Sequence, residues 1–259
     1  MRTLIKGAAV ASLVMTSSIA TASPLLWQDN SVTYLYGKDF QVDPSIQQTV
    51  TLEHVSGWSF GDLFMFVDSI HYNGEKDVAG NNSTWYGEIA PRLSLGKLSG
   101  QQFSFGPITD VLLAATYEQG RGDIKNYLLG PAVDLTVPGF DYLQLNTYYR
   151  HSDTPEGVRS AWQITPVWAF TIPAGRSDIL IDGYIDWIVD NDGGNGDKHA
   201  NLHFNPQVKY DLGKALGWQA KQLYTGIEYS YWKNKYGLQN VSGFDTNQNV
   251  TNLLVKMHF

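Results

Sequence analysis

The sequence predicts an all-β protein, a twelve-stranded antiparallel β-barrel that spans a membrane. Three observations favour this class: a leader-like N-terminus, short runs of alternating apolar and polar residues, and aromatic residues near the ends of those runs. The 259 residues are 43% hydrophobic and 13% aromatic, which excludes a disordered chain. The absence of cysteine excludes disulfides, thiol catalysis and thiolate metal sites. The net charge of −7 disfavours a nucleic-acid partner, which requires a basic surface.

Residues 1–22 are typical of a cleaved signal peptide. Arg2 and Lys6 precede a short apolar segment, and Ala20-x-Ala22 is a small-residue cleavage site. The apolar segment is shorter than the roughly 20 residues of a transmembrane helix. We therefore expect export, cleavage after Ala22 and a mature chain of residues 23–259. Because no linker divides that chain, one barrel domain is expected.

The mature chain alternates with a period of two residues, as strands with one apolar face do. Within residues 84–95 the odd positions are mostly apolar, whereas Thr84, Glu88, Arg92 and Ser94 occupy even positions. A helix would distribute such polar residues around its whole surface. Twelve runs of this kind are found, near 31–38, 46–55, 61–72, 84–95, 109–119, 125–137, 141–151, 160–172, 178–190, 200–211, 221–233 and 249–259.

The connections between these runs differ in length. Those after even-numbered runs are mostly short, such as residues 173–176, whereas those after odd-numbered runs are mostly longer and polar, such as residues 73–83 and 233–248. This pattern predicts a barrel of the Gram-negative outer membrane, with short periplasmic turns and longer extracellular loops. An even number of strands places both termini on the periplasmic side.

Aromatic residues favour a membrane barrel over the soluble β-sandwich that alternation alone would also allow. Rings with polar edges are suited to the lipid headgroup level, where they form girdles. The residues expected there are Trp27, Trp58, Trp168, Tyr210, Tyr231 and Phe259. Several runs also approach the roughly 9–11 residues that a tilted membrane strand needs. Phe259 closes the chain and resembles the terminal signal of outer-membrane barrels.

Four prolines conflict with regular pairing, because proline cannot donate a ladder hydrogen bond. They lie inside the fourth, sixth, eighth and tenth runs, at Pro91, Pro131, Pro166 and Pro206. A closed barrel has no edge strand that could accommodate them. We therefore predict bulges or local breaks at these positions.

Four segments carry a resemblance to a known family. Residues 88–99 read EIAPRLSLGKLS and are followed by Phe103-Ser-Phe-Gly-Pro107. This resembles the nucleoside-specific channel family of Tsx and the related OmpK proteins, as do residues 64–68 and the IDGYID sequence of residues 181–186. The resemblance implies a monomeric outer-membrane barrel with a narrow pore for nucleosides. It also implies outer loops of the kind that phage and colicins recognise.

Alternation assigns a set of side chains to the barrel interior. Those expected to contact a solute are Phe64, Phe66, Asp68, Tyr86, Glu88, Arg92, Asp182, Tyr184, Asp186 and Glu228. Bases stack on aromatic rings, and carboxylates or arginine can bind ribose hydroxyls. Acidic residues outnumber basic ones in the predicted interior, so we expect nucleosides to be favoured over nucleotides. Glu88 and Arg92 lie about 13 Å apart on one strand, so each should pair with a neighbouring strand.

Other interpretations remain open at this stage. The interior charges could form salt-bridge ladders in a packed lumen, and the barrel would then serve as a closed surface receptor for phage or colicin. Enzymatic activity is not expected, because His151-Ser152-Asp153 are adjacent in the chain and cannot form a triad. No cofactor or metal is expected either. The acidic loop of residues 190–197 lacks the closing glutamate of a helix-loop-helix calcium site. The expected partners are therefore outer-membrane lipid and small solutes.

Overall fold

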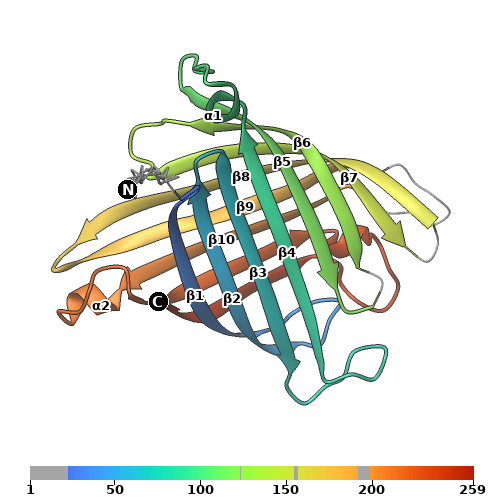
Figure 1. Ribbon diagram of the computed structural model, residues 1–259. Coiled ribbons are helices and arrows are strands. Elements are labelled where there is room, and N and C mark those ends of the chain that lie inside the picture. The colour runs from blue at the N-terminus through green and yellow to red at the C-terminus, as the bar shows by residue number, and fades with distance from the viewer. Residues whose placement is uncertain (1–22, 123, 155–156, 192–198) are drawn as a thin grey trace, which may run out of the picture.

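The computed structural model describes residues 23–122, 124–154, 157–191 and 199–259. They form a closed antiparallel barrel in which each strand pairs with its sequence neighbours and β1 pairs with β12 (Figure 1). The strands are β1 (Leu25–Lys38), β2 (Ile46–Trp58), β3 (Gly61–Tyr72), β4 (Ser83–Ser94), β5 (Ile108–Gly120), β6 (Lys125–Leu135), β7 (Tyr142–Thr154), β8 (Gly157–Ala174), β9 (Ser177–Asn191), β10 (Asn201–Asp211), β11 (Leu223–Lys233) and β12 (Gln248–His258). The predicted fold is confirmed. The predicted signal peptide, residues 1–22, lies outside the described residues.

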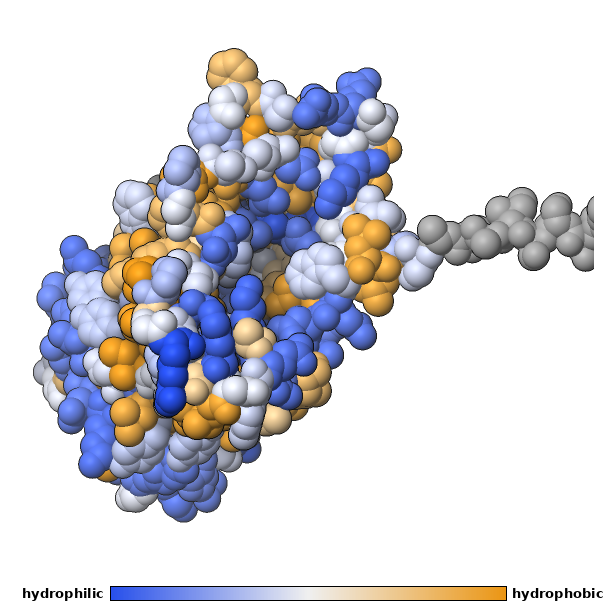
Figure 2. Space-filling model, turned by 90° about the vertical axis from the view of Figure 1, so that its left-hand side faces the viewer, coloured by the Kyte–Doolittle hydropathy of each residue, from blue (hydrophilic) through white to orange (hydrophobic). Residues whose placement is uncertain are grey.

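The strands place most of their apolar side chains outside and most of their polar side chains inside, the reverse of a soluble protein. On β12, Leu253 is 65% exposed whereas the adjacent Asn252 is 3% exposed. Lys209 on β10 is 1% exposed, although lysine is among the residues least often buried. Seen from the end that holds the N-terminus, hydrophilic side chains gather around a central hollow (Figure 2). This inversion is what a barrel needs when its outer wall contacts lipid and its lumen is polar.

The two ends of the barrel differ. Both termini lie at one end, where the Phe259 amide donates to the Asn30 carbonyl (2.9 Å). At this end β2–β3 and β8–β9 are joined by two residues each. Two other connections here are longer because they contain the short helices α1 (Leu95–Ser99) and α2 (Leu212–Ala215). The opposite end holds the long loops of residues 73–82 and 234–247, the second of which includes the 3-10 turn η1 (Lys235–Gly237).

The two helices form because their sequences provide matching caps. The Ser94 hydroxyl accepts a hydrogen bond from the Lys97 amide (3.1 Å), and the Asp211 carboxylate accepts one from the Lys214 amide (2.8 Å). Gly100 ends α1 in the left-handed conformation (φ 68°), which glycine adopts at little cost. Each helix therefore stops after about one turn, close to its strand.

Among the described residues, no helix has the length and apolar character required to cross a membrane.

Strand β1 begins at Leu25, six residues before the predicted start at residue 31. A register shift between Leu25 and Trp27 reverses the facing pattern there. The polar residues Gln28, Asp29 and Asn30 then obscure the alternation. The strand was therefore predicted too short at the end where its pairing with β2 is irregular.

The four prolines break the ladders locally, as predicted, but they do not cause bulges. Pro206 keeps its pairing with Gly183 on β9. On the β11 side, the ladder stops at Phe204 and resumes at Gln207 in the same register. The same two-residue gap without a register shift occurs at Pro91 toward β5, at Pro131 toward β7 and at Pro166 toward β9. Each gap lies on the one side where the missing proline N–H would have donated.

Candidate functional site: the barrel lumen

All ten residues predicted to contact a solute lie on the inner face of the wall. Across β2–β5, ladder pairing places inner-face residues of adjacent strands side by side: Glu53↔Phe66, Phe66↔Glu88 and Glu88↔Glu118. On the other side, Asp186 and His203 are partners, as are Asp182 and Gln207. Inner-face residues of adjacent strands are thereby brought together, which period-two alternation alone could not establish.

An aromatic run lines one part of the lumen. The ring centres of Phe64 and Phe66 are 5.7 Å apart, and those of Phe66 and Tyr86 are 5.9 Å apart. Two carboxylates lie beside these rings: Glu88 accepts from the Tyr86 hydroxyl (2.7 Å), and Asp68 accepts from the Thr51 hydroxyl (2.5 Å). The run therefore offers flat apolar surfaces next to hydrogen-bond acceptors.

The Arg92 side chain is enclosed by ion pairs rather than exposed to the lumen. Its guanidinium donates to both carboxylate oxygens of Asp62 (2.8 and 2.7 Å) and to Asp134 (2.8 Å). The prediction that Arg92 pairs across strands is confirmed. The corresponding prediction for Glu88 is wrong, because its hydrogen-bond donor is Tyr86 on its own strand. Side chains two residues apart share a face, so a tyrosine can reach the glutamate without a neighbouring strand.

The part of the lumen formed by β8–β11 carries the remaining acidic candidates. Asp182 pairs with the buried Lys209 (2.7 Å). Asp186 accepts from the Thr165 hydroxyl (2.7 Å) and the Gln163 amide (2.9 Å). These two aspartates share a face, but only Asp182 forms an ion pair with a cation of the described residues.

Glu228 on β11 is likewise held by neutral donors, the Gln207 amide (2.8 Å) and the Asn252 amide (3.0 Å). The ion pairs of the described residues do not include Asp68, Glu88, Asp186 or Glu228. By contrast, Arg150 pairs with Glu118 (2.5 Å). Lys256 pairs with Glu53 (2.6 Å). The lumen thus contains four carboxylates that have no cationic partner among the described residues.

His203 belongs to this wall, although it was not among the predicted contact residues. Its ring stacks on Trp232 with centres 4.0 Å apart and planes at 12°. Its Nδ1 lies 3.2 Å from the Tyr184 hydroxyl. The sequence alone could have placed His203 on this wall. His203 and Lys209 are both at odd positions of β10 and therefore lie on the same face of the strand. A second aromatic surface therefore lies on β9–β11, in addition to the one on β3–β4.

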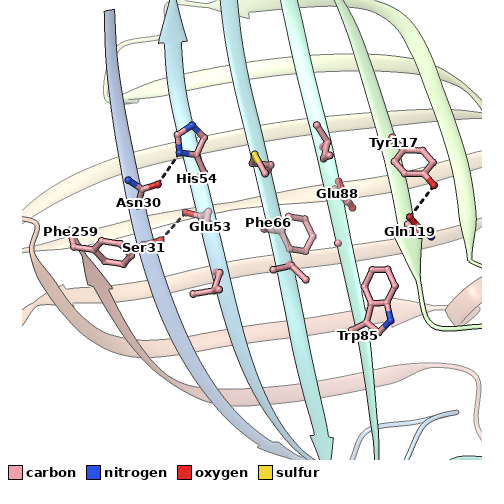
Figure 3. A pocket seen from close by; sticks show the side chains of 15 residues that line it. Asn30, Ser31, Glu53, His54, Phe66, Trp85, Glu88, Tyr117, Gln119 and Phe259 are labelled. Atoms are coloured by element: carbon pink, nitrogen blue, oxygen red, sulfur yellow. Dashed lines mark hydrogen bonds between the residues drawn. The ribbon is translucent and has the colours of Figure 1, made fainter. Parts of the chain in front are cut away.

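A groove of about 460 Å³ lies over β1–β5, and Glu53, Phe66 and Glu88 of the lumen contribute to its lining (Figure 3). Its apolar members, including Leu52, Val67 and Ile89, are outward-facing and exposed. Gly87 contributes no side chain between them, which deepens the groove. The groove faces lipid, so it is not on the path of a solute through the lumen.

Among the described residues, no cluster of histidine, aspartate and glutamate is arranged to hold a metal ion. Most of the acidic loop of residues 190–197 lies outside the described residues.

Comparison with known proteins agrees with the barrel and its lumen. The family described as nucleoside-specific channel-forming protein, Tsx, matches residues 22–257. The outer membrane protein OmpK of Vibrio parahaemolyticus is 23% identical over 255 residues, which cover 90% of this chain and 93% of OmpK. An OmpK from the Vibrio parahaemolyticus strain RIMD 2210633 is 26% identical over 193 residues, covering 69% of this chain and 68% of that protein.

Two solved structures are also similar. The KdgM porin has a TM-score of 0.47 and 13% identity, over 88% of this chain and 99% of the porin. The COG4313 outer membrane channel from Pseudomonas putida F1 has a TM-score of 0.47 and 11% identity, over 96% of this chain and 100% of that channel.

The family match and the relatives establish in which membrane the barrel lies. It lies in the outer membrane. In outer-membrane barrels, the end with the short turns faces the periplasm and the end with the long loops faces the outside of the cell. The family is one of channel-forming proteins. The chain belongs to the Tsx family of outer-membrane channel-forming proteins.

Proposed function

We propose that the channel conducts nucleosides by facilitated diffusion. The observation that carries this proposal is the aromatic run Phe64–Phe66–Tyr86 beside carboxylates that have no cationic partner, Asp68 and Glu88. A nucleobase stacks on aromatic rings, with about 1–3 kcal/mol per stacked base. A carboxylate accepts hydrogen bonds from ribose hydroxyls. Each half of a nucleoside thus has a matching surface within two strands.

The second surface supports the same solute. Tyr184, His203 and Trp232 provide rings on β9–β11, and Asp186 and Glu228 provide acceptors nearby. Ionised lumen carboxylates that lack a cationic partner oppose a phosphate group, because like charges in a confined lumen repel strongly. We infer that nucleosides are favoured over nucleotides. Diffusion of this kind needs no energy source and no coupling protein.

Liposome swelling tests the proposal. Proteoliposomes containing the channel should swell faster in isosmotic adenosine than in isosmotic adenosine monophosphate. Vesicles that contain the Phe66→Leu, Tyr86→Leu double variant should lose most of the preference for adenosine over a sugar of similar size. Equal rates for adenosine and its monophosphate would contradict the charge argument, and an unchanged preference in the double variant would contradict the stacking argument.

A closed barrel that serves as a phage or colicin receptor is the second candidate. Its supporting observation is the density of lumen bonding: Arg150 alone donates to Glu118 and to Gln163 (2.9 Å). Such a barrel would give no swelling with any solute, while phage adsorption to cells would require the outer loops.

The channel is proposed to act as a monomer, since one barrel encloses the whole lumen.

A further inference from the structure

The barrel closes between β1 and β12, and this seam is paired over only part of its length. The ladder runs from Ser31↔His258 to Tyr36↔Leu253. Strand β1 continues to Lys38, where it still pairs with Ile46 of β2. Strand β12 begins at Gln248, several residues beyond the last pair. The two strands therefore part toward the extracellular rim.

A cavity of about 320 Å³ occupies the place where they part. It is lined by Tyr36, Gly37, Lys38, Asp39, Asn249, Thr251 and Leu253. Leu253 is 65% exposed, and Lys38, Asn249 and Thr251 are also exposed, so the cavity opens on the lipid-facing side of the wall. The rim of the cavity combines an apolar side chain with polar groups. This combination suits an amphipathic ligand.

Only one layer of side chains separates this cavity from the lumen. Gly37 carries no side chain, and the Phe40 ring lies over it, with Cε2 2.9 Å from where a Cβ would stand. Asn252, on the inner face of β12, donates to Glu228 (3.0 Å). Its Oδ1 is buried and has no hydrogen-bond partner in the described part of the chain. An unpaired buried acceptor at this point is costly unless a ligand or water donates to it.

A clamp lies beside the cavity, where the residues after β1 meet the start of β12. The buried Lys235 ammonium has three donors, and it donates to the Gln41 carbonyl (2.9 Å), the Asp43 carboxylate (2.8 Å) and the Gln248 amide oxygen (2.7 Å). Lys235 is 3% exposed. One side chain from the β11–β12 loop thereby ties the residues after β1 to the first residue of β12.

The loop that this clamp holds has an unfavourable backbone. Asp39 (φ 69°) and Val42 (φ 71°) are in the left-handed region, which a β-branched residue rarely adopts. They flank Phe40 and Gln41 on either side. Such conformations persist when surrounding contacts impose them. Release of Lys235 would let this loop relax and carry Phe40 away from Gly37.

We propose that the β1–β12 seam is a latched lateral window, which opens a route between the outer leaflet and the lumen for small amphipathic solutes. Lys235 is the latch and Phe40 the plug. The Asn252 oxygen accepts a hydrogen bond from a hydroxyl or amine of the passing solute. The window is distinct from the axial path proposed for nucleosides and does not depend on it.

The cysteine-free chain allows a direct test by site-specific labelling. The Asn252→Cys variant is reconstituted in phosphatidylcholine vesicles that contain a phosphatidylethanolamine with a maleimide on its headgroup. A lipid-tethered maleimide reaches this inward-facing cysteine only through the window. We expect slow labelling with the latch intact and labelling about tenfold faster when Lys235→Met is added, as a shift in the open population would give. Asp43→Asn should act in the same direction.

Two controls separate the window from general loosening. The Thr251→Cys variant faces lipid, so Lys235→Met should leave its labelling rate unchanged. Lys214→Met removes an ion pair with Asp178 (2.5 Å) at the opposite end of the barrel and should not accelerate labelling of Asn252→Cys. A water-soluble charged thiosulfonate confirms that the cysteine is reachable from the lumen. If neither Lys235→Met nor Asp43→Asn accelerates lipid-tethered labelling, the window does not exist. If Lys214→Met accelerates it equally, Lys235 is not the latch.

Discussion

Arg92 of β4 and Asp62 of β3 form a bidentate ion pair inside the barrel, with nitrogen–oxygen distances of 2.8 and 2.7 Å. The remaining guanidinium nitrogen reaches Asp134 of β6. A planar fork of donors suits two carboxylates better than an ammonium does. One buried cation therefore connects three strands near the periplasmic end of the lumen.

Removal of this cation should destabilise the barrel. Arg92→Met leaves Asp62 and Asp134 close together without a counter-charge. We expect a loss of about 3–5 kcal/mol in the free energy of unfolding, the range for breaking a buried pair. Urea unfolding in detergent micelles measures it. Lys125→Met is the matched control, because Lys125 and Asp153 form an exposed pair (3.5 Å) that should contribute only about 0–1 kcal/mol. Equal losses in the two variants would contradict the stabilising role of the Arg92 ion pairs.

The proline gaps should close when the missing donor is restored. Pro206→Ala adds an N–H that faces β11, where the ladder is interrupted. A new ladder hydrogen bond should stabilise the barrel by about 0.5–1.5 kcal/mol, and the new amide should exchange slowly with deuterium. Pro138→Ala, in the β6–β7 turn, should show neither effect. Rapid exchange at position 206 would mean that the gap does not depend on the proline.

Aromatic stacking in the lumen should set the affinity for nucleosides. Phe66→Leu keeps an apolar side chain but removes the ring that contacts Phe64 and Tyr86. We expect adenosine to bind about 5- to 150-fold more weakly, which corresponds to about 1–3 kcal/mol of stacking. Phe170→Leu removes an outer ring that contacts Phe140 and should leave binding unchanged. Tryptophan fluorescence titration provides the measurement, and a similar affinity in both variants would exclude Phe66 as a contact.

The uncompensated carboxylates should control charge selectivity. Asp68→Asn with Glu228→Gln removes two negative charges and retains the shape of both side chains. We expect the preference for adenosine over its monophosphate to fall about 3- to 10-fold, and the potassium-to-chloride preference of the pore to fall with it. Reversal potentials across a salt gradient report the second effect. Unaltered reversal potentials would show that these carboxylates do not face the permeation path.

The extracellular β3–β4 loop should loosen in acid. Backbone hydrogen bonds from Asn81 (2.7 Å) and Ala79 (3.0 Å), together with bonds from the Asn81 side chain, lower the pKa of the Asp77 carboxyl from its ordinary value of 3.8. A lowered pKa gives stabilisation that is complete above the ordinary value and is lost as the pH falls through the lowered one. Amide exchange at Asn81, corrected for its intrinsic pH dependence, should therefore accelerate at low pH. Asp77→Ala should exchange rapidly at every pH.

Much of the fold could be predicted from the sequence because alternation is a local property. The faces of Asp68, Glu88 and Asp186 follow from a period of two within a single strand. The predicted binding roles of these residues stay predictions. The helix α2 was not predicted, because its cap Asp211 also fits the end of an alternating run.

The remaining features depend on side-chain rotamers or on pairing between distant parts of the chain. Glu88 accepts a hydrogen bond from Tyr86 rather than from a residue of a neighbouring strand. This pairing depends on the rotamers of both side chains. Lys235 donates to the carbonyl of Gln41, 194 residues away in the chain. No local pattern connects two loops that meet only when the barrel closes. The Lys235 contacts at the seam were therefore visible only in the structure.

Single-channel recording in planar bilayers tests the proposed nucleoside channel most directly. With the purified protein in potassium chloride, we expect small steady conductance steps that adenosine interrupts in a concentration-dependent manner, with far weaker interruption by adenosine monophosphate. A pore that conducts without any response to adenosine would contradict a nucleoside site. A protein that inserts but never conducts would contradict an open lumen.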